Sequence, residues 1–442
     1  MSIYFLGIGG IGMSAIARFF LQCGKKVHGY DRTPSPLTEQ LEEAGAILHF
    51  QEDITAIPDD VEYVVYTPAV PKTHKEYLYF QEHNIPIHKR SEVLGKLTDG
   101  HFTIAVAGTH GKTTTTAMLA HLLDPYRNIT AFIGGIAKNF DSNIIIHKDF
   151  DTAIVEADEF DRSFLTLHPT LAVITSMDAD HLDVYGDRSH LIESFQLFAN
   201  QVKGTLLIHE KVAQLVSHPH KLVYGTGTEC DYTIGDVSMT PRTAAFTLTE
   251  RDGRAHRFTV GVSGQHNVTN AAAACAIGLL LGLTDEQIQR QMESFSGVKR
   301  RFDYQICRDD LVFIDDYAHH PEEIRAIVTA VKRLYAGKEL TVVFQPHLYT
   351  RTRDFGPQFA EVLSLADRVI LLDIYPAREL PIEGITSQWL LNQIDTKKKI
   401  LISKENLLPY LKGNRPQVLL TVGAGDIDRL VPVIREGLQT NQ

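Results

Sequence analysis

The sequence IAVAGTHGKTTTT at residues 104–116 places a loop of small residues between a strand-like apolar run and a helix-like segment. Glycines at 108 and 111 let backbone N–H groups turn toward an anion, and the helix that follows presents its positive end. The Lys112 ammonium can then reach the outer phosphates of a nucleotide, and the Thr113 hydroxyl can reach Mg²⁺. This arrangement predicts a nucleotide-binding loop.

The loop departs from the usual nucleotide-binding pattern at one position. The spacing G-x-x-x-x-G-K-[ST] would need glycine where this chain has Val106. A glycine- and threonine-rich turn without a ligand is the alternative, but GKT directly after a strand favours nucleotide binding. The residues that we expect to bind the nucleotide phosphates are consecutive: Gly108, Thr109, His110, Gly111, Lys112, Thr113 and Thr114.

Length and composition restrict the class of protein. The chain has 442 residues, enough for about three ordinary domains, and is 44% apolar and 22% charged, as globular proteins are. A net charge of −11 argues against a nucleic-acid-binding surface. The four cysteines are scattered, and the longest apolar stretch, residues 271–283, is too short to span a bilayer. We expect a cytoplasmic protein with no nucleic-acid or membrane partner.

Strand-like and helix-like segments alternate along the chain, which predicts an α/β fold with parallel sheets. A first unit covers residues 1–97, and a second, residues 98–297, begins with the strand before the nucleotide loop. The second unit also contains a more β-like, hydrophilic stretch at residues 231–262. A third unit, residues 298–442, contains four strand candidates that each end in polar or glycine-rich residues: LVFIDDYAHH, LTVVFQPH, RVILLDIYPA and QVLLTVGAGD.

A second glycine-rich loop, GIGGIG at residues 7–12, follows the first strand. Gly7, Gly9 and Gly12 match G-x-G-x-x-G, and Asp31 ends the next strand at about the distance expected of a ribose-binding acid. The motif suits any pyrophosphate, so a dinucleotide and a nucleotide-diphosphate sugar both remain open. Glycines that only allow close strand-helix packing are the alternative.

Acidic residues follow two strands of the second unit. Glu156 ends the strand TAIVE, and its carboxylate is our candidate Mg²⁺ ligand because this ion prefers oxygen donors. We expect the carboxylates of Asp158, Glu159 and Asp161 to be merely solvated. His181 ends another strand beside three aspartates, where a role as ligand of a second metal and a structural role are equally open.

Polar residues elsewhere form two further candidate groups. Asn267 and Asn270 lie three residues apart on one helix face, where they can bind a nucleotide or cap the helix. Basic residues, histidines and two aspartates lie at the entrance of the third unit and after its strands, where the basic residues and histidines suit a phosphoryl group or a carboxylate. This group consists of Arg300, Arg301, Asp315, Asp316, His319, His320, His347, Arg351 and Arg353.

In chain order, these motifs make the sequence similar to the Mur ligases of peptidoglycan synthesis from end to end: GIGGIGMS, GTHGKTTTT, VEADE, DADHLDVYG, GQHNVTNAAAA, RRFD, DDYAHHP and FQPH. The shortened nucleotide loop is normal for that family. The resemblance implies a Rossmann-like N-terminal domain for a UDP-sugar, a central P-loop ATPase-type domain and a Rossmann-like C-terminal domain for an amino acid. The chain is most similar to the alanine-adding branch, which agrees with the absence of lysine between His181 and Lys203.

The resemblance also implies the reaction. ATP phosphorylates the lactyl carboxylate of UDP-N-acetylmuramate, and the amine of L-alanine attacks the acyl phosphate, with ADP and phosphate released. By position in the matching motifs, Lys112 holds the γ-phosphate, Thr113 and Glu156 bind one Mg²⁺, and His181 binds a second. Asn267 and Asn270 serve adenine binding and substrate positioning, and Arg301 and Asp316 serve ATP binding and domain closure. The implied catalytic residues are Lys112, Glu156, His181, Arg301 and Asp316. The implied substrate-binding residues are Gly7, Gly9, Gly10, Gly12, Asp31, His319, His320, His347 and Arg351.

Three alternatives remain. A recycling ligase that attaches a preformed tripeptide to the same UDP-sugar shares the early motifs. An NAD-dependent oxidoreductase would use GIGGIG and Asp31 but leaves GTHGKT unexplained. A catalytically silent nucleotide-binding regulator conflicts with the presence of Lys112, Glu156 and His181. One departure affects the substrate loop: Leu348 follows FQPH where many such ligases have arginine, and Arg351 and Arg353 are the candidates to replace that charge. We expect a monomer or homodimer.

Overall fold

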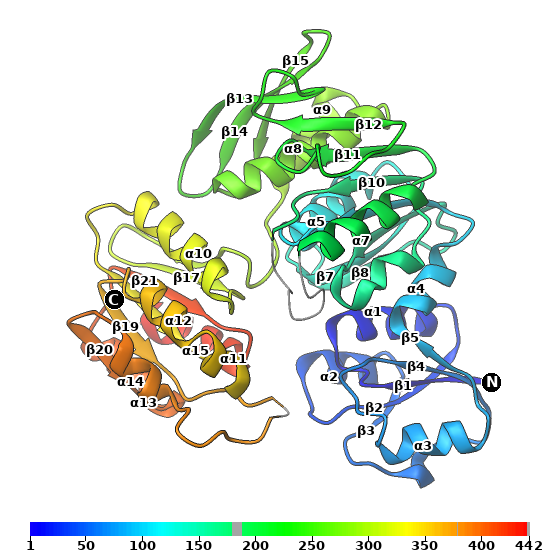
Figure 1. Ribbon diagram of the computed structural model, residues 1–442, viewed down its shortest axis with the longest axis horizontal. Coiled ribbons are helices and arrows are strands. Elements are labelled where there is room, and N and C mark those ends of the chain that lie inside the picture. Colours follow the sequence, from blue (N-terminus) through cyan, green and yellow to red (C-terminus); the bar gives the residue numbers. More distant parts are fainter. Residues whose placement is uncertain (179–187, 378, 440–442) are drawn as a thin grey trace. The chain divides into compact units, whose positions relative to one another are not determined.

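The computed structural model describes residues 1–178, 188–377 and 379–439. The chain forms two compact units, Met1–Val298 and Lys299–Gln442 (Figure 1). From here on these two are called the first and the second unit, and the three ranges expected from the sequence are given by residue number. Among the described residues, no helix is long and apolar enough to cross a membrane.

The N-terminal part of the first unit is a five-stranded parallel sheet in the order β3-β2-β1-β4-β5. Its strands are β1 (Ser2–Leu6), β2 (Lys26–Tyr30), β3 (Ile47–His49), β4 (Val61–Tyr66) and β5 (Ile87–Lys89). Its helices are α1 (Ile11–Gln22), α2 (Pro36–Glu43), η1 (Ile54–Ala56), α3 (Lys75–Glu82) and α4 (Arg90–Thr98).

Successive residues of β1 face opposite sides of this sheet, so both faces can be covered. Ile3 and Phe5 pack with α1 and α4 in a core that continues into the following sheet. Tyr4 and Leu6 pack with Phe80 of α3 on the other face. The GIGGIG loop therefore lies at the carboxyl end of a strand that is buried on both sides.

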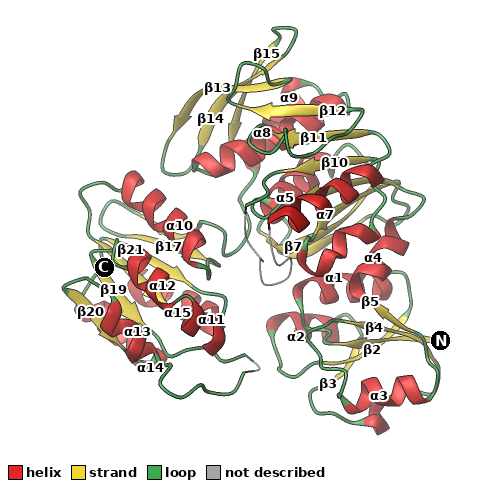
Figure 2. Ribbon diagram, in the orientation of Figure 1, coloured by secondary structure: helices red, strands yellow, loops and turns green. Residues whose placement is uncertain are grey.

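The second sheet has ten strands in the order β15-β14-β13-β12-β11-β10-β6-β9-β7-β8. These are β6 (Phe102–Ala107), β7 (Ile129–Ala137), β8 (Ser142–Ile146), β9 (Thr152–Ala157), β10 (Leu171–Ile174), β11 (Thr205–His209), β12 (Lys221–Gly225), β13 (Tyr232–Met239), β14 (Ala244–Glu250) and β15 (Ala255–Val260). The helices are α5 (Lys112–Leu123), η2 (Phe160–Thr166), α7 (Arg188–Gln201), α8 (Gln265–Leu280) and α9 (Asp285–Ser294). Figure 2 shows β13, β14 and β15 as long neighbouring strands, and their pairing is antiparallel.

Helices cover both faces of the central strands of this sheet. Ile104 and Val106 of β6 pack with α5 and α8, while Ala105 and Ala107 face the core that contains α7. Val106 pairs with Glu156 in the register of β6 and β9. Position 106, where the usual motif would have glycine, is thus an inner strand residue, and the phosphate loop begins only after Ala107.

The second unit contains a six-stranded sheet in the order β16-β17-β21-β18-β19-β20, parallel except for β16. Its strands are β16 (Asp303–Cys307), β17 (Val312–Asp316), β18 (Leu340–Phe344), β19 (Arg368–Leu371), β20 (Lys398–Leu401) and β21 (Val418–Val422). Its helices are α10 (Pro321–Leu334), α11 (Tyr349–Asp354), α12 (Gly356–Leu363), α13 (Ser387–Gln393), α14 (Lys404–Gly413), η3 (Asp426–Arg429) and α15 (Leu430–Gln439). Helices α10, α12 and α13 cover one face, and α14 and α15 the other.

The predicted α/β class is confirmed. The four strands expected within residues 298–442 are β17, β18, β19 and β21. The expectation missed β16 and β20, which lie at the two edges of the sheet. Strand β20 begins with two exposed lysines, Lys398 and Lys399, and none of its four residues is buried, so it lacks the apolar run of an inner strand. The boundaries that we place after residues 97 and 297 stay predictions.

Candidate active site

The phosphate loop is shaped by two glycines between β6 and α5. Gly108 has φ +136°, and a Cβ there would lie 2.1 Å from Oγ1 of Thr175. Gly111, the residue before α5, has φ +81°, and a Cβ there would lie 2.5 Å from Oδ1 of Asn270. Both backbone conformations belong to the region that favours glycine. Sterics and conformation together explain why the loop needs small residues.

Replacing Gly111 with alanine is expected to destabilise the first unit by about 1–2 kcal/mol, because a Cβ is strained at positive φ and meets Asn270. Denaturant unfolding of the full chain measures this change, and ADP titration should show weaker binding. The control is Gly235→Ala, where φ is not positive and nothing lies within 4 Å of the new Cβ. Equal stability of the two variants would contradict the steric account.

The segment after β10 forms hydrogen bonds with the phosphate loop through Ser176. Thr109 N donates to Ser176 O at 3.2 Å, and His110 N donates to Ser176 Oγ at 2.9 Å. The Thr109 hydroxyl lies 2.9 Å from Ser176 Oγ. Two backbone donors of the loop are therefore engaged by protein, and the anion-binding donors that remain are those of residues 111–114. N–H groups in the first turn of a helix have no partner within that helix.

Two side chains fit a bound Mg²⁺. Thr113 Oγ1 lies 2.9 Å from Glu156 Oε2, and the same carboxylate oxygen accepts a hydrogen bond from Gly134 N at 3.0 Å. A hydroxyl and a carboxylate at this distance are hard oxygen donors, and Mg²⁺ typically takes its other ligands from phosphate and water. Within the described ranges, no three His, Cys, Asp or Glu side chains gather as a complete metal site. His181 lies outside the described residues.

Lys112 forms a buried ion pair at the mouth of the loop. Its Nζ donates to Glu159 Oε2 at 2.7 Å and Oε1 at 3.0 Å, and to the carbonyl of Gly108 at 2.7 Å. Burial alone would lower the pKa of Lys112, but the carboxylates of Glu159 and Glu156 outweigh it and raise that pKa. The ammonium therefore stays charged, as phosphate binding requires.

The expectation that Glu159 is solvated is wrong, because its side chain is 0% exposed. Asp158 is 39% exposed, and its Oδ2 lies 3.8 Å from Nη2 of Arg90. Sequence reasoning missed Glu159 because a run of acids in a loop is usually hydrated. The sequence carries no local signal that sets Glu159 apart from its neighbour Asp158.

Helix α8 brings one of the two predicted asparagines to the loop. Asn270 is 6% exposed and lies beside Gly111. Asn267, one turn earlier, donates from Nδ2 to Ser263 O at 2.7 Å, which ties the start of the helix to the chain before it. The structure thus joins residues of the phosphate loop, the end of β9 and α8 in one place.

The GIGGIG loop is held by its predicted acid. Gly9 N donates to Asp31 Oδ2 at 2.7 Å, and Thr33 N donates to Asp31 Oδ1 at 3.2 Å. Gly7 follows β1, Gly10 precedes α1, and the Arg90 guanidinium packs on Gly12. Asp31 therefore shapes the loop, and its contact with a ribose stays a prediction.

A buried asparagine joins this loop to the second sheet. Asn143 of β8 donates from Nδ2 to the carbonyl of Ile11 at 2.6 Å and to Ser14 Oγ at 2.9 Å. Both partners belong to the first turn of α1. The helix end that would bind a pyrophosphate is thus fixed by a strand of the nucleotide-binding part of the same unit.

The second unit collects its candidates at the carboxyl ends of β17 and β18. Asp316 accepts hydrogen bonds from Phe302 N at 2.7 Å and Ala318 N at 2.8 Å. Burial raises the pKa of Asp316 to about 6, against the opposing charge of Arg301. The Arg301 guanidinium lies 5.5 Å from the ring centre of Tyr317 and is exposed. Arg300 instead pairs with the buried Asp315 at 3.0 Å and is structural.

His319, which follows β17, and His347, which follows β18, lie close together in this unit. The rings of His319 and His347 are 6.3 Å apart, and His347 stacks on Tyr375 at 5.7 Å. Arg351 Nη1 lies 3.4 Å from His347 Nδ1. His320, which precedes α10, packs instead against Phe355, which follows α11. The structure therefore groups three of the predicted substrate residues, and it adds Tyr375.

The loop after β18 shows how the chain manages without arginine at position 348. Leu348 has φ +70° and precedes α11, which turns Arg351 back toward His347. Arg353 pairs with its neighbour Asp354 at 2.7 Å and is half exposed. Of the two arginines expected to replace the charge, Arg351 lies with the candidate substrate residues.

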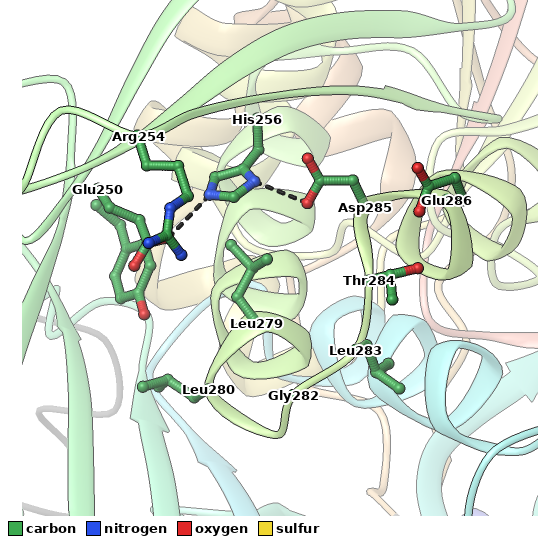
Figure 3. A pocket seen from close by; sticks show the side chains of 11 residues that line it. Glu250, Arg254, His256, Leu279, Leu280, Gly282, Leu283, Thr284, Asp285 and Glu286 are labelled. Atoms are coloured by element: carbon green, nitrogen blue, oxygen red, sulfur yellow. Dashed lines mark hydrogen bonds and ion pairs between the residues drawn. The ribbon is translucent and has the colours of Figure 1, made fainter.

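A separate pocket lies between β14, β15 and the start of α9 (Figure 3). His256, 5% exposed, has Nδ1 at 2.7 Å from Asp285 Oδ1 and Nε2 at 2.9 Å from Glu250 Oε1. Both ring nitrogens are thus engaged, and the contact ties α9 to the edge of the sheet. None of the pocket's lining residues belongs to the phosphate loop, so we assign this cluster a structural role.

Comparison with known proteins gives one consistent family. Sequence profiles match in order: "Mur ligase family, catalytic domain" at residues 2–102, "Mur ligase middle domain" at 106–278 and "Mur ligase, glutamate ligase domain" at 300–425. The chain is 47% identical over 443 residues to a UDP-N-acetylmuramate–L-alanine ligase of Flavobacterium psychrophilum, with 99% of this chain and 98% of that protein covered.

Solved structures give the same fold. A UDP-N-acetylmuramate-alanine ligase from Thermotoga maritima matches with a TM-score of 0.85 and 28% identity over 100% of both chains. A murein peptide ligase from Psychrobacter arcticus matches with a TM-score of 0.72 and 21% identity, over 100% of this chain and 99% of that one. The second likeness shows the fold alone.

Proposed function

The chain belongs to the Mur ligase family, and from this premise we propose that it joins L-alanine to UDP-N-acetylmuramate at the expense of ATP. The product is UDP-N-acetylmuramoyl-L-alanine, a peptidoglycan precursor, with ADP and phosphate. The observation that carries this choice is the 47% identity, from end to end, to a ligase of that name. We place the reaction in the cytoplasm, in a monomer or homodimer.

The order of bond changes follows from the chemistry of the carboxylate. A carboxylate is a poor electrophile until one of its oxygens becomes a good leaving group, so the lactyl carboxylate first attacks the γ-phosphorus of ATP and ADP leaves. The alanine amine then attacks the acyl phosphate carbon, and the C–O bond to phosphate breaks. The protein contributes positioning and neutralisation of charge.

The nucleotide is assigned to the first unit. Residues 108–114 would form the loop around its phosphates, with the N–H groups of residues 111–114 as donors, the Lys112 ammonium on the γ-phosphate and Asn270 beside the loop. Thr113 and Glu156 would hold Mg²⁺, which neutralises phosphate charge when bound. The 2.9 Å contact between their oxygens supports this assignment. His181 is proposed for a second Mg²⁺ on its motif alone.

The remaining substrates are assigned by motif and fold. Residues 1–97 would bind UDP-N-acetylmuramate at the GIGGIG loop, residues 98–297 the nucleotide, and residues 298–442 L-alanine. In the last of these, Arg351 beside His347 offers a cation for the carboxylate of alanine. Arg301 and Asp316 would act on ATP. Tyr375 joins the proposed alanine site through its stacking on His347.

The tripeptide-adding ligase is the competing function. A solved structure of such a ligase is 22% identical to this chain, below the 28% of the solved alanine ligase and the 47% of the alanine-adding relative from Flavobacterium psychrophilum. An oxidoreductase or a silent regulator would leave the paired oxygens of Thr113 and Glu156, which fit a bound Mg²⁺, without a purpose.

The deciding experiment measures phosphate release from ATP and Mg²⁺ with UDP-N-acetylmuramate and one acceptor at a time. Release chiefly with L-alanine is expected, compared with glycine, L-serine and the L-Ala-γ-D-Glu-diaminopimelate tripeptide. Release only with the tripeptide would assign the chain to cell-wall recycling. No release with any acceptor would contradict the choice of UDP-sugar.

A further inference from the structure

Glu159 has no part in the reaction as proposed, yet it lies in direct contact with the phosphate-binding lysine. It follows β9 and is 0% exposed. Both carboxylate oxygens accept from Lys112 Nζ, at 2.7 and 3.0 Å. A buried carboxylate is costly without a cation, so Glu159 depends on the Lys112 ammonium.

The hydrogen bonds that Lys112 already makes limit how its ammonium can bind a nucleotide phosphate. An ammonium has three N–H groups and accepts no hydrogen bond. One N–H of Lys112 points to the Gly108 carbonyl at 2.7 Å, and the other two are within reach of the Glu159 oxygens. A phosphate oxygen can therefore bind this ammonium only if an existing contact is given up.

Glu159 is the partner that can release one contact and keep another. It has two oxygens on the same ammonium, whereas the Gly108 carbonyl belongs to the backbone of the loop and offers one. Giving up the 3.0 Å contact leaves the 2.7 Å contact in place. Lys112 would then touch the loop, Glu159 and the phosphate at once.

We propose that Glu159 is a positioning residue that competes with nucleotide phosphate for the Lys112 ammonium, yielding one hydrogen bond as ATP binds and recovering it as ADP leaves. The inference rests on the proposed ATP site. The lysine of a loop of this kind reaches the β-phosphate as well as the γ-phosphate, so the competition extends to ADP. It lowers nucleotide affinity, because two anions share one cation, and it favours release of ADP. A purely structural Glu159 would instead support nucleotide binding by keeping the loop intact.

Glu159→Gln tests the competition because it removes the charge and keeps the shape. Calorimetry with Mg²⁺ and ADP is expected to show about tenfold tighter binding. The KM for ATP and kcat should both fall, since ADP is retained. Unchanged or weaker ADP binding in the folded variant would overturn the proposal. A wild-type chain that binds no ADP would overturn the proposed ATP site as well.

Two further variants serve as a control for charge and as a second test of the competition. Asp158→Asn removes a charge that acts on the Lys112 ammonium through space but accepts none of its hydrogen bonds, and less than about a twofold change in ADP affinity is expected. An effect as large as that of Glu159→Gln would indicate general charge and overturn the competition. If Glu159→Gln fails to fold, Glu159→Asp is the second test. Its shorter side chain holds the carboxylate farther from Lys112, so this variant should bind ADP more tightly than the wild-type protein. Equal or weaker ADP binding would refute the proposal.

Discussion

Lys112→Met is expected to lower kcat for ATP-dependent ligation by about 10²- to 10³-fold, the range found when one preorganised charge-stabilising donor is removed. Methionine keeps most of the volume of the lysine stem but cannot donate to a phosphate. Phosphate release with UDP-N-acetylmuramate and L-alanine measures the loss. Binding of UDP-N-acetylmuramate, followed by calorimetry, should change little because it belongs to another domain in the proposed assignment.

The variant also leaves Glu159 buried without its cation, which costs about 3–5 kcal/mol for a buried pair. Loss of activity could then reflect unfolding, so the double variant Lys112→Met, Glu159→Gln is the fair comparison: it removes both charges together. We expect it to unfold closer to wild type and to remain inactive. Lys211→Met, at an exposed lysine in the same unit, is the control. Turnover in the double variant within about threefold of wild type would contradict the role of Lys112.

The fold was predictable where the chemistry of a segment is local. The strand before the phosphate loop is a continuous apolar run because β6 is buried on both faces. Each of the two expected anion-binding loops is rich in glycine and directly follows such a strand, so both could be located from the sequence. Strand β20 was missed for the opposite reason, since an edge strand carrying lysines has no apolar signal.

The candidate site was predictable in its residue types but not in its pairings. The sequence places Thr113 and Glu156 at the ends of neighbouring elements, and the register of β6 with β9 brings them together. Whether an acid is hydrated or buried depends on packing by distant segments. Glu159 and Asp158 are adjacent in sequence, yet one is fully buried and the other well exposed. No single-sequence pattern separates them.

The same limit applies to Tyr375 and Asn143. Tyr375 reaches His347 only because the chain after β19 runs beside the chain after β18. Asn143 reaches the first turn of α1 across more than a hundred residues. Each contact depends on how two elements pack, and neither residue belongs to a recognisable motif.

Removal of Mg²⁺ with a chelator is expected to abolish turnover, and Glu156→Gln to lower kcat about 10²-fold with a smaller effect on ADP affinity. The reason lies in the contacts of one oxygen: Glu156 Oε2 meets both the Thr113 hydroxyl and Gly134 N, which fixes the carboxylate beside the phosphate loop. Glutamine preserves the shape but supplies a neutral, weaker ligand. Steady-state phosphate release over a range of Mg²⁺ concentrations should show a higher metal requirement in the variant.

Glu210 offers a matched control, because its carboxylate also binds a threonine hydroxyl and a glycine N–H after a strand. Thr226 Oγ1 donates to it at 2.9 Å and Gly227 N at 2.7 Å, but it is not part of the phosphate loop. Glu210→Gln should therefore keep kcat within about twofold of wild type and leave the Mg²⁺ requirement unchanged. If Glu156→Gln behaved as Glu210→Gln does, the carboxylate would be fastening Gly134 rather than binding metal, and the assignment of the Mg²⁺ site to Thr113 and Glu156 would be wrong.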